Sequence, residues 1–392
     1  MRKGWEYKKL GEVCCPKSKN QRATKCFGAS DEIAYIDISS IDNSVQEVNS
    51  ITSFTMSNAP SRAQQKVEYG DIIVSTVRPN LKNVALIKQH DSNLVASSGF
   101  CVLRTTDDIE RNYLFRYITS DIFTQHLMKL TTGANYPAVR DLDVRDSTIP
   151  LPPKSTQLAI VSELDKINEL IRLKKEQLKD FDNLAQSLFY EMCGDPVENE
   201  KGWEVKKLGE IGEVKTGNTP SRSNDNFYNE KFIEWIKTDN IRNEQMNPTT
   251  AAEYLSKEGA ECGRIAGKGS ILVACIAGSL SSIGKCCITT KNVAFNQQIN
   301  AITPYGDFCN SIYLYELIRN SSKYIQQNAT TGMKHILSKS IFEKLKFPLP
   351  PLPLQRLFAQ RIEQIEREKS EVQKSIQDLE TLLASRMQYW FE

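Results

Sequence analysis

Hydrophobic residues recur at alternating steps of three and four in two stretches of the chain, one after residue 153 and one after residue 351. This spacing aligns one apolar seam along a helix and is typical of helices that pair in a coiled coil. Two seam positions hold lysines, Lys174 and Lys369, which would either fix the register of the pair or extend to solvent. The apolar seam positions are Ile160, Leu164, Ile167, Ile171, Leu178, Phe181 and Leu188 in the first stretch and Phe358, Ile362, Ile365, Val372, Ile376, Leu379 and Leu383 in the second.

Both stretches belong to a repeat of 198 residues. The segment "IPLPPKSTQ" at 149–157 returns as "FPLPPLPLQ" at 347–355, and "GWEYKKLGE" at 4–12 returns as "GWEVKKLGE" at 202–210. This period is far longer than that of a solenoid repeat, so a whole domain and its connector are written twice. A two-fold relationship between the copies would pair the two helices as an antiparallel coiled coil.

The proline clusters mark where each helix begins, because proline disfavours helical backbone before it. The sequence therefore predicts a domain at 1–153, a helical connector at 154–200, a second domain at 201–351 and a second helix at 352–392.

Each domain is predicted to be mixed α/β. The β-branched runs "DIIVSTV" at 71–77 and "SILVACI" at 270–276 indicate strands. Residues 112–130 and 311–327 are patterned as amphipathic helices ending near Gly133 and Gly332, glycines typical of helix C-termini. The copies share their apolar skeleton and differ between its positions, which predicts one fold with two different surfaces.

Charge is distributed unevenly along the chain. The whole chain carries +2, whereas the two domains carry +2 and +5 and the two helical segments −4 and −1. This asymmetry favours a polyanionic partner for the domains. No apolar run is long enough for a membrane span, the start lacks the apolar stretch of a secretory signal, and adjacent cysteines without CxxC spacing predict buried thiols in a reducing, cytoplasmic setting.

Motifs for catalysis are missing from the sequence. The segment "GSLSSIGKC" at 278–286 has one residue too many for a phosphate loop and ends in Cys286 instead of a hydroxyl residue. No HExxH or GxSxG occurs, and none of the three histidines returns at its repeat position. The sequence predicts a non-catalytic chain without a metal site.

This organisation resembles the specificity subunit of Type I restriction-modification systems. The resemblance covers nearly the whole chain and rests on the duplicated order of "GWE.KKLGE", domain, "PLPP...Q" and long helix, together with "GEIGEVKTGNTPSR" at 209–222. The first copy, "GEVCCPKSKNQR" at 11–22, departs from that opening. The resemblance implies binding to double-stranded DNA, to two modification subunits and to restriction subunits for cleavage. It assigns S-adenosylmethionine, ATP and Mg to those partners, so that this chain binds no cofactor.

The helices have the length expected of a spacer between two half-sites. From Ile160 to Leu188 there are about 28 rises of about 1.5 Å, or roughly 42 Å. At about 3.4 Å per base pair this corresponds to about 12 base pairs. Each domain is then predicted to read one half of a bipartite, asymmetric target. The alternative is a structural scaffold whose two domains bind protein; an enzyme with an unrecognised site is disfavoured by the lack of a repeated polar cluster.

Candidate DNA-contacting residues lie in loops that follow strands or helices, since such loops commonly carry function. Arginine suits a guanine edge, asparagine an adenine edge and lysine a phosphate. The alternative for the 75–85 loop is a solvated turn at Pro79 and Asn80, and for 215–222 a turn at Asn218 and Pro220. "FNQQIN" at 295–300 is expected on a strand that places Asn296 and Gln298 on one face. The candidates are Arg78, Asn80, Lys82, Asn83, Asn135, Tyr136 and Arg140 in the first domain and Thr216, Asn218, Ser221, Ser279, Ser281, Ser282, Lys285, Lys334 and His335 in the second.

Overall fold

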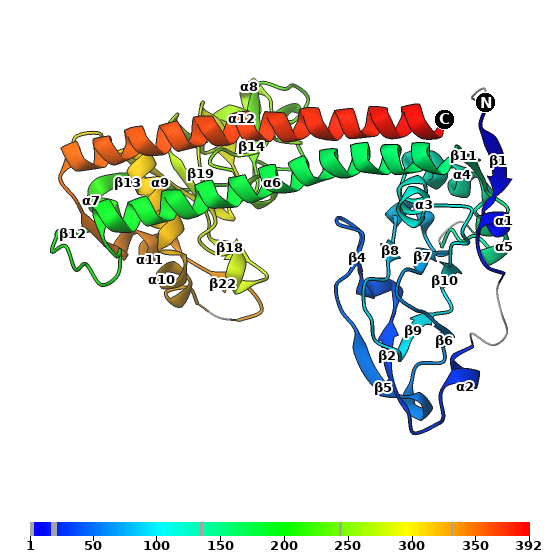
Figure 1. Cartoon of the computed structure of the whole chain (residues 1–392). Coiled ribbons are helices and arrows are strands. Elements are labelled where there is room, and N and C mark those ends of the chain that lie inside the picture. Colours follow the sequence, from blue (N-terminus) through cyan, green and yellow to red (C-terminus); the bar gives the residue numbers. More distant parts are fainter. Residues whose placement is uncertain (1–3, 17–21, 134–135, 243–244, 331) are drawn as a thin grey trace. The chain divides into compact units, whose positions relative to one another are not determined.

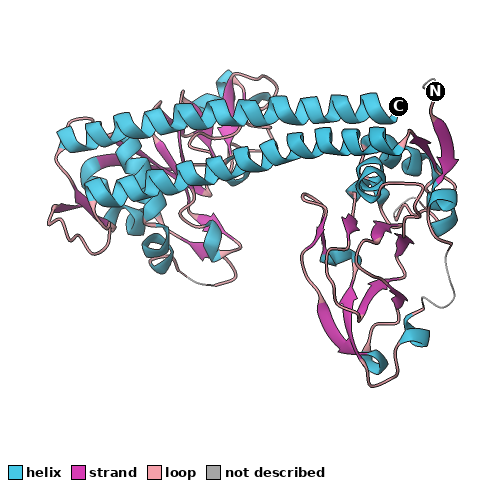
Figure 2. Cartoon of the chain, viewed as in Figure 1, coloured by secondary structure: helices cyan, strands magenta, loops and turns pink. Residues whose placement is uncertain are grey.

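The computed structural model describes residues 4–16, 22–133, 136–242, 245–330 and 332–392. The chain divides into unit 1, residues Met1–Lys175 and Lys374–Glu392, and unit 2, residues Glu176–Gln373. Each unit combines a mixed α/β domain with a segment of both long helices, α6 (Lys154–Cys193) and α12 (Leu352–Phe391) (Figure 1). Strands and helices are interspersed in both domains (Figure 2), which confirms the predicted class. The division into units runs through both helices and not at residues 153 and 351.

The domain of unit 1 contains a four-stranded sheet in the order β5-β2-β9-β6 and a three-stranded sheet in the order β10-β7-β8. Strands β2 and β9 are parallel, whereas the other pairs in these two sheets are antiparallel. The strands are β1 (Glu6–Lys9), β2 (Glu32–Ile36), β3 (Ile41–Asp42), β4 (Glu47–Val48), β5 (Thr52–Thr55), β6 (Ala63–Lys66), β7 (Ile72–Ser75), β8 (Val84–Leu86), β9 (Leu94–Ser97), β10 (Phe100–Leu103) and β11 (Thr148–Leu151). The helices are α1 (Leu10–Val13), α2 (Ala23–Cys26), α3 (Arg111–Ile118), α4 (Asp121–Leu130) and α5 (Asp141–Arg145).

The domain of unit 2 contains two four-stranded sheets, in the orders β13-β21-β17-β19 and β15-β14-β20-β16. Strands β14 and β20 form the parallel pair, as β2 and β9 do in unit 1. The strands are β12 (Glu204–Lys207), β13 (Gly212–Thr216), β14 (Ile233–Ile236), β15 (Tyr254–Leu255), β16 (Ile265–Ala266), β17 (Ile271–Ala274), β18 (Ile276–Ala277), β19 (Cys286–Ile288), β20 (Val293–Phe295), β21 (Ile299–Pro304), β22 (His335–Ile336) and β23 (Lys346–Leu349). The helices are α7 (Leu208–Ile211), α8 (Lys257–Cys262), α9 (Ser311–Asn320), α10 (Ser322–Gln327) and α11 (Lys339–Lys344).

The repeated proline and glutamine residues fix the start of each long helix. Gln157 is buried; its side chain accepts a hydrogen bond from the Glu110 amide at 2.8 Å and donates one to the Pro152 carbonyl at 2.9 Å. Gln355 does the same in unit 2, with the Asn310 amide at 2.9 Å and the Pro350 carbonyl at 2.8 Å. A buried glutamine that pairs with both groups avoids the cost of unsatisfied backbone. The repeated "PLPP...Q" therefore joins helix and domain in both copies.

Each helix predicted at 112–130 and 311–327 is divided in two. In unit 1 the break falls between α3 and α4, where the Ser120 hydroxyl accepts the Phe123 amide as an N-cap. In unit 2 it falls at Ser321, between α9 and α10. Gly133 and Gly332 were predicted to end these helices, and that prediction is also wrong. Helix α4 already ends at Leu130, followed by Thr131 in extended conformation, and α10 ends at Gln327.

Within each unit the two long helices pair antiparallel along the predicted seam. In unit 1 the Glu163 carboxylate accepts hydrogen bonds from Arg386 and from the Trp390 ring nitrogen at 3.1 Å. In unit 2 the rings of Phe189 and Phe358 lie 5.7 Å apart. Every apolar residue of the predicted seam is buried or half-buried. The pattern of steps of three and four therefore identified the packed side of both helices.

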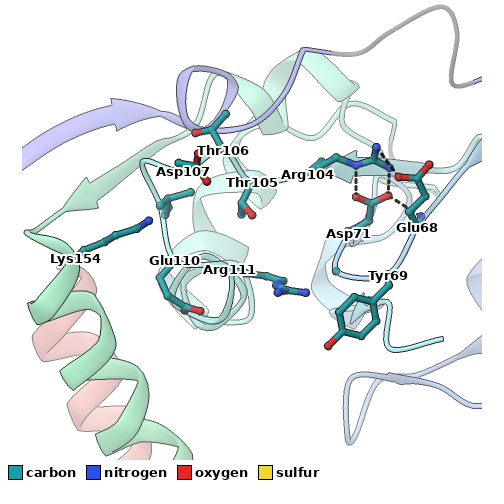
Figure 3. Close-up of a pocket in the computed structure, with 12 residues that line it drawn as sticks. Glu68, Tyr69, Asp71, Arg104, Thr105, Thr106, Asp107, Glu110, Arg111 and Lys154 are labelled. Atoms are coloured by element: carbon teal, nitrogen blue, oxygen red, sulfur yellow. Dashed lines mark hydrogen bonds and ion pairs between the residues drawn. The ribbon is translucent and has the colours of Figure 1, made fainter. Parts of the chain in front are cut away.

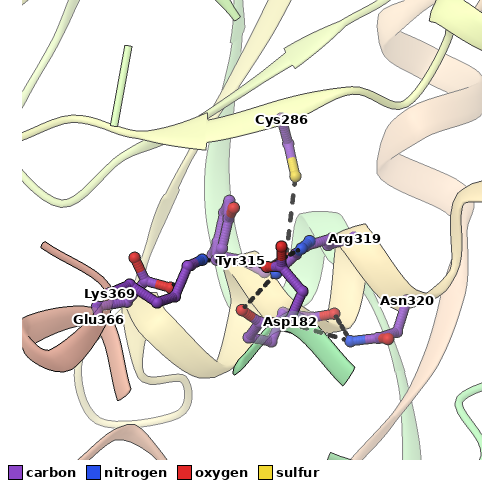
Figure 4. Close-up of polar contacts among 8 residues, drawn as sticks. Asp182, Cys286, Tyr315, Arg319, Asn320, Glu366 and Lys369 are labelled. Atoms are coloured by element: carbon purple, nitrogen blue, oxygen red, sulfur yellow. Dashed lines mark hydrogen bonds and ion pairs between the residues drawn. The ribbon is translucent and has the colours of Figure 1, made fainter. Parts of the chain in front are cut away.

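An ionic network around the buried Lys369 connects the domain of unit 2 to both long helices (Figure 4). The Asp182 carboxylate of α6 accepts hydrogen bonds from Lys369 of α12 at 3.0 Å and from Arg319 of α9 at 2.9 Å. Lys369 also pairs with Glu366 at 2.8 Å and is only 5 % exposed. Extension of Lys369 to solvent, one of two predicted alternatives, is therefore wrong, and its ammonium group stays inside the helix pair.

Burial of the thiols agrees with the prediction for most cysteines. Seven of the ten are buried and all ten are free thiols; Cys26 and Cys262 are exposed. Burial raises the pKa of the Cys275, Cys287 and Cys309 thiols to about 12. Among the described residues no helix is both long enough and apolar enough to cross a membrane.

Candidate nucleic-acid interface

In unit 1 the two loops predicted to contact DNA are joined to each other. Val77 forms a β-bridge with Ala138, and the Val139 amide donates to the Thr76 carbonyl at 2.9 Å. The guanidinium of Arg78 lies over the ring of Tyr136, 4.6 Å from its centre. The fold therefore brings together two residues that the sequence places in separate loops.

Left-handed backbone shapes the first of these loops. Arg78 and Lys82 have φ of 50° and 51° and flank the 3₁₀ helix η4 (Pro79–Leu81). Such values are uncommon for residues other than glycine and occur where the surroundings impose them. The turn predicted at Pro79 and Asn80 is thus present, and it leaves Arg78 and Asn80 exposed. The turn and the contact role of Arg78 are compatible.

The other candidate residues in unit 1 differ in the hydrogen bonds and ion pairs that they form within the protein. Lys82 donates to the Asp121 carboxylate at 2.6 Å, and Arg140 pairs with Asp143 at 2.6 Å. Asn83 is half-buried, and its carbonyl accepts the Ser75 amide at 2.9 Å. Asn135 lies outside the described residues. Tyr136 is 68 % exposed, and Arg78 and Asn80 are exposed as well.

In unit 2 the two corresponding loops are also joined, here by a pair of short strands instead of a single β-bridge. Strands β18 and β22 pair through Ile276 with Ile336 and Ala277 with His335, which joins the loops 277–285 and 330–339. Ser279 precedes the 3₁₀ helix η7 (Leu280–Ser282), and its hydroxyl lies 3.2 Å and 3.0 Å from those of Ser281 and Ser282. Lys334 is exposed and Lys285 half-buried. Serine hydroxyls and lysine ammonium groups are both among the side-chain groups that contact phosphates.

The segment 215–222 has a structural role at two of its predicted contact residues. The Thr216 hydroxyl donates to Asn300 at 2.7 Å, and the Asn218 side chain donates to the Cys262 carbonyl at 2.8 Å and accepts the Arg264 amide at 2.7 Å. These side chains hold the loop in place. Ser221, by contrast, is exposed.

Residues 296–298 form a turn between β20 and β21, so the strand predicted over 295–300 is wrong. The Gln298 amide donates to the Asn296 side chain at 3.1 Å, which closes the turn locally. The Gln298 carbonyl accepts the Cys275 amide at 2.8 Å, and Gln297 accepts a hydrogen bond from Thr219. The turn thus joins the 215–222 segment to the strand that leads into the 277–285 loop.

The sequence analysis did not predict a cluster of aromatic and charged residues that lies beside the 215–222 segment. The Arg222 guanidinium lies 4.5 Å from the ring centre of Tyr228 and 4.8 Å from that of Trp235. The Lys237 ammonium lies 4.9 Å from the Trp235 ring centre, and both cations pair with Glu253. Basic residues interleaved with aromatics over 222–237 were the signal available in the sequence.

A metal-binding cluster is not found in the described part of the chain. No group of three or more His, Cys, Asp or Glu side chains there is arranged to hold a metal ion. A surface pocket of about 440 Å³ in unit 1 is lined by charged side chains, of which Asp71 and Glu68 already pair with Arg104 (Figure 3). Its lining contains neither histidine nor cysteine. The loops described above remain the candidate site.

The chain is similar to known proteins of Type I restriction-modification systems, both in sequence and in structure. The Type I restriction enzyme HindI specificity subunit of Haemophilus influenzae is 23% identical over an alignment 438 positions long. The alignment covers 91% of this chain and 92% of that protein. A solved chain from work on complex assembly and conformational transition of the type I R-M system has a TM-score of 0.66 and 26% identity, covering 99% of this chain and 97% of its own. The S subunit of the Type I restriction-modification system of M. genitalium, at 14% identity and a TM-score of 0.54, shares the fold; 99% of this chain and 96% of that chain are covered.

The family comparison covers both halves of the repeat. The model of the Type I restriction modification DNA specificity domain matches residues 2–180 and again residues 200–381. These two matches include the α/β domain of each unit and most of both long helices. The chain therefore belongs to the family of Type I restriction-modification specificity subunits and carries two copies of its specificity domain.

Proposed function

We propose that this chain recognises a bipartite, asymmetric DNA target, with the domain of each unit reading one half-site. The observation that carries the proposal is that the two loops predicted independently to contact DNA are joined by a β-bridge or ladder in each domain. The residues at these junctions differ between the copies: Arg78 and Tyr136 in unit 1, serines and lysines in unit 2. One frame with two different reading surfaces suits two unlike half-sites.

The chemistry of unit 1 fits base reading. An arginine stacked on an aromatic ring keeps its donors in one plane, and that plane matches the two acceptors of guanine in the major groove. Asn80, exposed in the same turn, has the donor and acceptor that adenine requires. In unit 2 the serines of η7, Lys285 and Lys334 are suited to phosphate, which positions a domain without itself specifying sequence.

The long helices are proposed to set the spacer between the half-sites. Both α6 and α12 contain 40 residues, and the rise of about 1.5 Å per residue converts a number of residues into a distance. Half-sites about one helical turn apart lie on one face of the duplex. A helix pair of fixed length would therefore select one spacer among many.

The same helices offer surface for the modification subunits. Large apolar side chains stay exposed outside the seam: Leu158, Leu170, Leu173 and Leu184 on α6 and Leu357 and Leu382 on α12. Contiguous exposed apolar patches mark surfaces that bind protein, and we propose that these leucines form such a surface. We place two modification subunits there and restriction subunits in the cleaving complex, all in the cytoplasm. S-adenosylmethionine, ATP and Mg would be bound by those partners, and this chain would be non-catalytic.

Mapping methylated adenines tests the proposal. DNA from cells that carry this chain and its modification subunits is sequenced for methylated adenine, beside DNA from cells that lack only this chain. A single bipartite motif with an unread spacer is expected. Exchange of residues 1–153 for the first domain of another family member should then change one half-site alone. Methylation that ignores sequence, or exchange that alters both half-sites, would contradict the reading roles and favour a protein-binding scaffold.

A further inference from the structure

The cluster around Trp235 combines cations, an aromatic face and one shared carboxylate. The side chains of Arg222 and Lys237 are 51 % and 30 % exposed, so neither cation is buried in the core. Both lie close to the Trp235 ring, which itself is buried. Glu253 pairs with both and is 37 % exposed. Its hydrogen bonds from Lys237 and Arg222 keep the pKa of the carboxyl below its usual value, so Glu253 is ionised at neutral pH.

Hydrogen bonds connect this cluster to the candidate interface of unit 2. The Trp235 ring nitrogen donates to the Asn218 carbonyl at 3.3 Å, and the Tyr228 hydroxyl donates to the Pro220 carbonyl at 2.7 Å. The aromatic pair therefore supports the 215–222 segment, which the 296–298 turn joins to the strand before the serine loop. Arg222 is at the exposed end of that segment.

A carboxylate and a phosphate present similar oxygen pairs to arginine. Arginine binds both through two parallel hydrogen bonds, and a ring beneath the guanidinium leaves those donors directed outward. A position where Arg222 and Lys237 converge on the Glu253 oxygens is thus also a position for two phosphate oxygens. A carboxylate held there competes with any phosphate that approaches.

We propose that Arg222 and Lys237 form a clamp for a backbone phosphate of duplex DNA and that Glu253 occupies this clamp in the free protein. This inference rests on the proposed function, because it assigns the phosphate to the DNA that the domain reads. Binding would transfer the two cations from Glu253 to the phosphate, so Glu253 lowers the affinity of unit 2 for DNA of any sequence. Sequence readout stays with the neighbouring loops.

Replacement of Glu253 by glutamine tests the clamp, since it keeps the shape of the side chain and removes its charge. The full chain, assembled with its modification subunits, is titrated into a labelled 40-base-pair duplex of mixed sequence, and anisotropy is measured at several KCl concentrations. Glu253→Gln removes the two ion pairs that hold Arg222 and Lys237, so it is expected to tighten binding about 2- to 30-fold. The matched control is Glu204→Gln, which removes one charge from an exposed pair with Lys206 on β12 and should leave binding unchanged.

A second variant covers the case in which Glu253→Gln disturbs the fold. Arg222→Gln removes an exposed cation, should keep the melting temperature, and is expected to weaken binding and reduce the slope of log K against log salt by about 0.9, the value of one phosphate contact. Two results would overturn the clamp: DNA binding by Arg222→Gln that equals wild type, or DNA binding by Glu253→Gln that is no tighter than that of Glu204→Gln. If the wild-type complex binds DNA in either case, the proposed function is unaffected. A wild-type complex that binds no duplex would overturn both.

Discussion

The guanidinium of Arg78 lies 4.6 Å from the centre of the Tyr136 ring, and the Arg78 amide donates to the Pro137 carbonyl at 2.7 Å. Backbone and side chain of one residue are therefore both fixed by the other loop. Arginine has many rotamers to lose on binding, and stacking removes part of that cost before any ligand arrives. A stacked, exposed arginine is thus prepared for recognition in a way that a solvated loop arginine is not.

Arg78→Ala should weaken binding to the cognate site by about 1–3 kcal/mol and relax the target at one position, because a bidentate contact to a base would be lost. The measurement is selection of bound sequences from a library in which each half-site position is randomised. Arg172→Ala serves as control, since it removes the same charge from unit 1 at a helix residue paired with Glu169. If the two variants select the same motif, Arg78 reads no base and only forms the turn.

Lys285→Ala should act differently, because a lysine on a phosphate contributes to every sequence alike. Affinity is expected to fall for cognate and unrelated duplexes by a similar factor, and the salt slope to fall by about one. Titration of both duplexes at several salt concentrations measures this. Lys291→Ala, which removes a lysine paired with Glu234 in the same domain, is the matched control. A loss confined to the cognate duplex would instead assign Lys285 to base readout.

The repeat and the heptad pattern predicted the elements that depend on residues close in sequence. The start of α6 follows from the prolines and Gln157, and the buried side of α12 from the positions of Phe358 and Ile362. The break before α4 also had a local signal, since serine followed by aspartate at 120–121 is a good helix start.

The roles of some residues depend on contacts between segments that are distant in sequence, and these roles were not predicted. Thr216 and Asn218 have the side chains of a phosphate-binding loop, yet they are held by Asn300 and the backbone near α8. The position of Arg222 over Trp235 depends on how β14 lies beside the 215–222 segment. No periodicity records such tertiary neighbours, so the interface residues are less predictable than the helices.

Lys369 is expected to stabilise unit 2. Lys369→Ala leaves Glu366 without its ammonium partner and removes one of two cations from Asp182. Because these carboxylates are partly exposed, the expected loss is about 1–3 kcal/mol, between values for exposed and for fully buried pairs. Thermal unfolding of the full chain measures it. Lys369→Ile copies the residue found 198 positions earlier, Ile171, and should lose less than the alanine variant because isoleucine fills the seam. Equal melting of Lys369→Ala and wild type would show that the network contributes no stability.

The spacer role of the helices is testable by deleting one heptad from each. Removal of residues 172–178 together with 371–377 preserves the seam, because the pattern repeats after seven residues. Both deleted segments lie between the pair Glu163–Arg386 of unit 1 and the pair Asp182–Lys369 of unit 2, so both pairs remain.

Seven residues correspond to roughly 10 Å, or about three base pairs. The deletion protein should therefore recognise the same two half-sites across a spacer shorter by about three base pairs. Some affinity will be lost, since this change turns one half-site by roughly 100° around a duplex of about 10 base pairs per turn. The deciding measurement is the spacer selected from a library in which both half-sites are fixed and the distance varies. A deletion of 169–175 alone, which shortens one helix and not the other, is the control and should impair folding. A well-folded double-deletion protein that still selects the wild-type spacer would show that the helices do not set the distance.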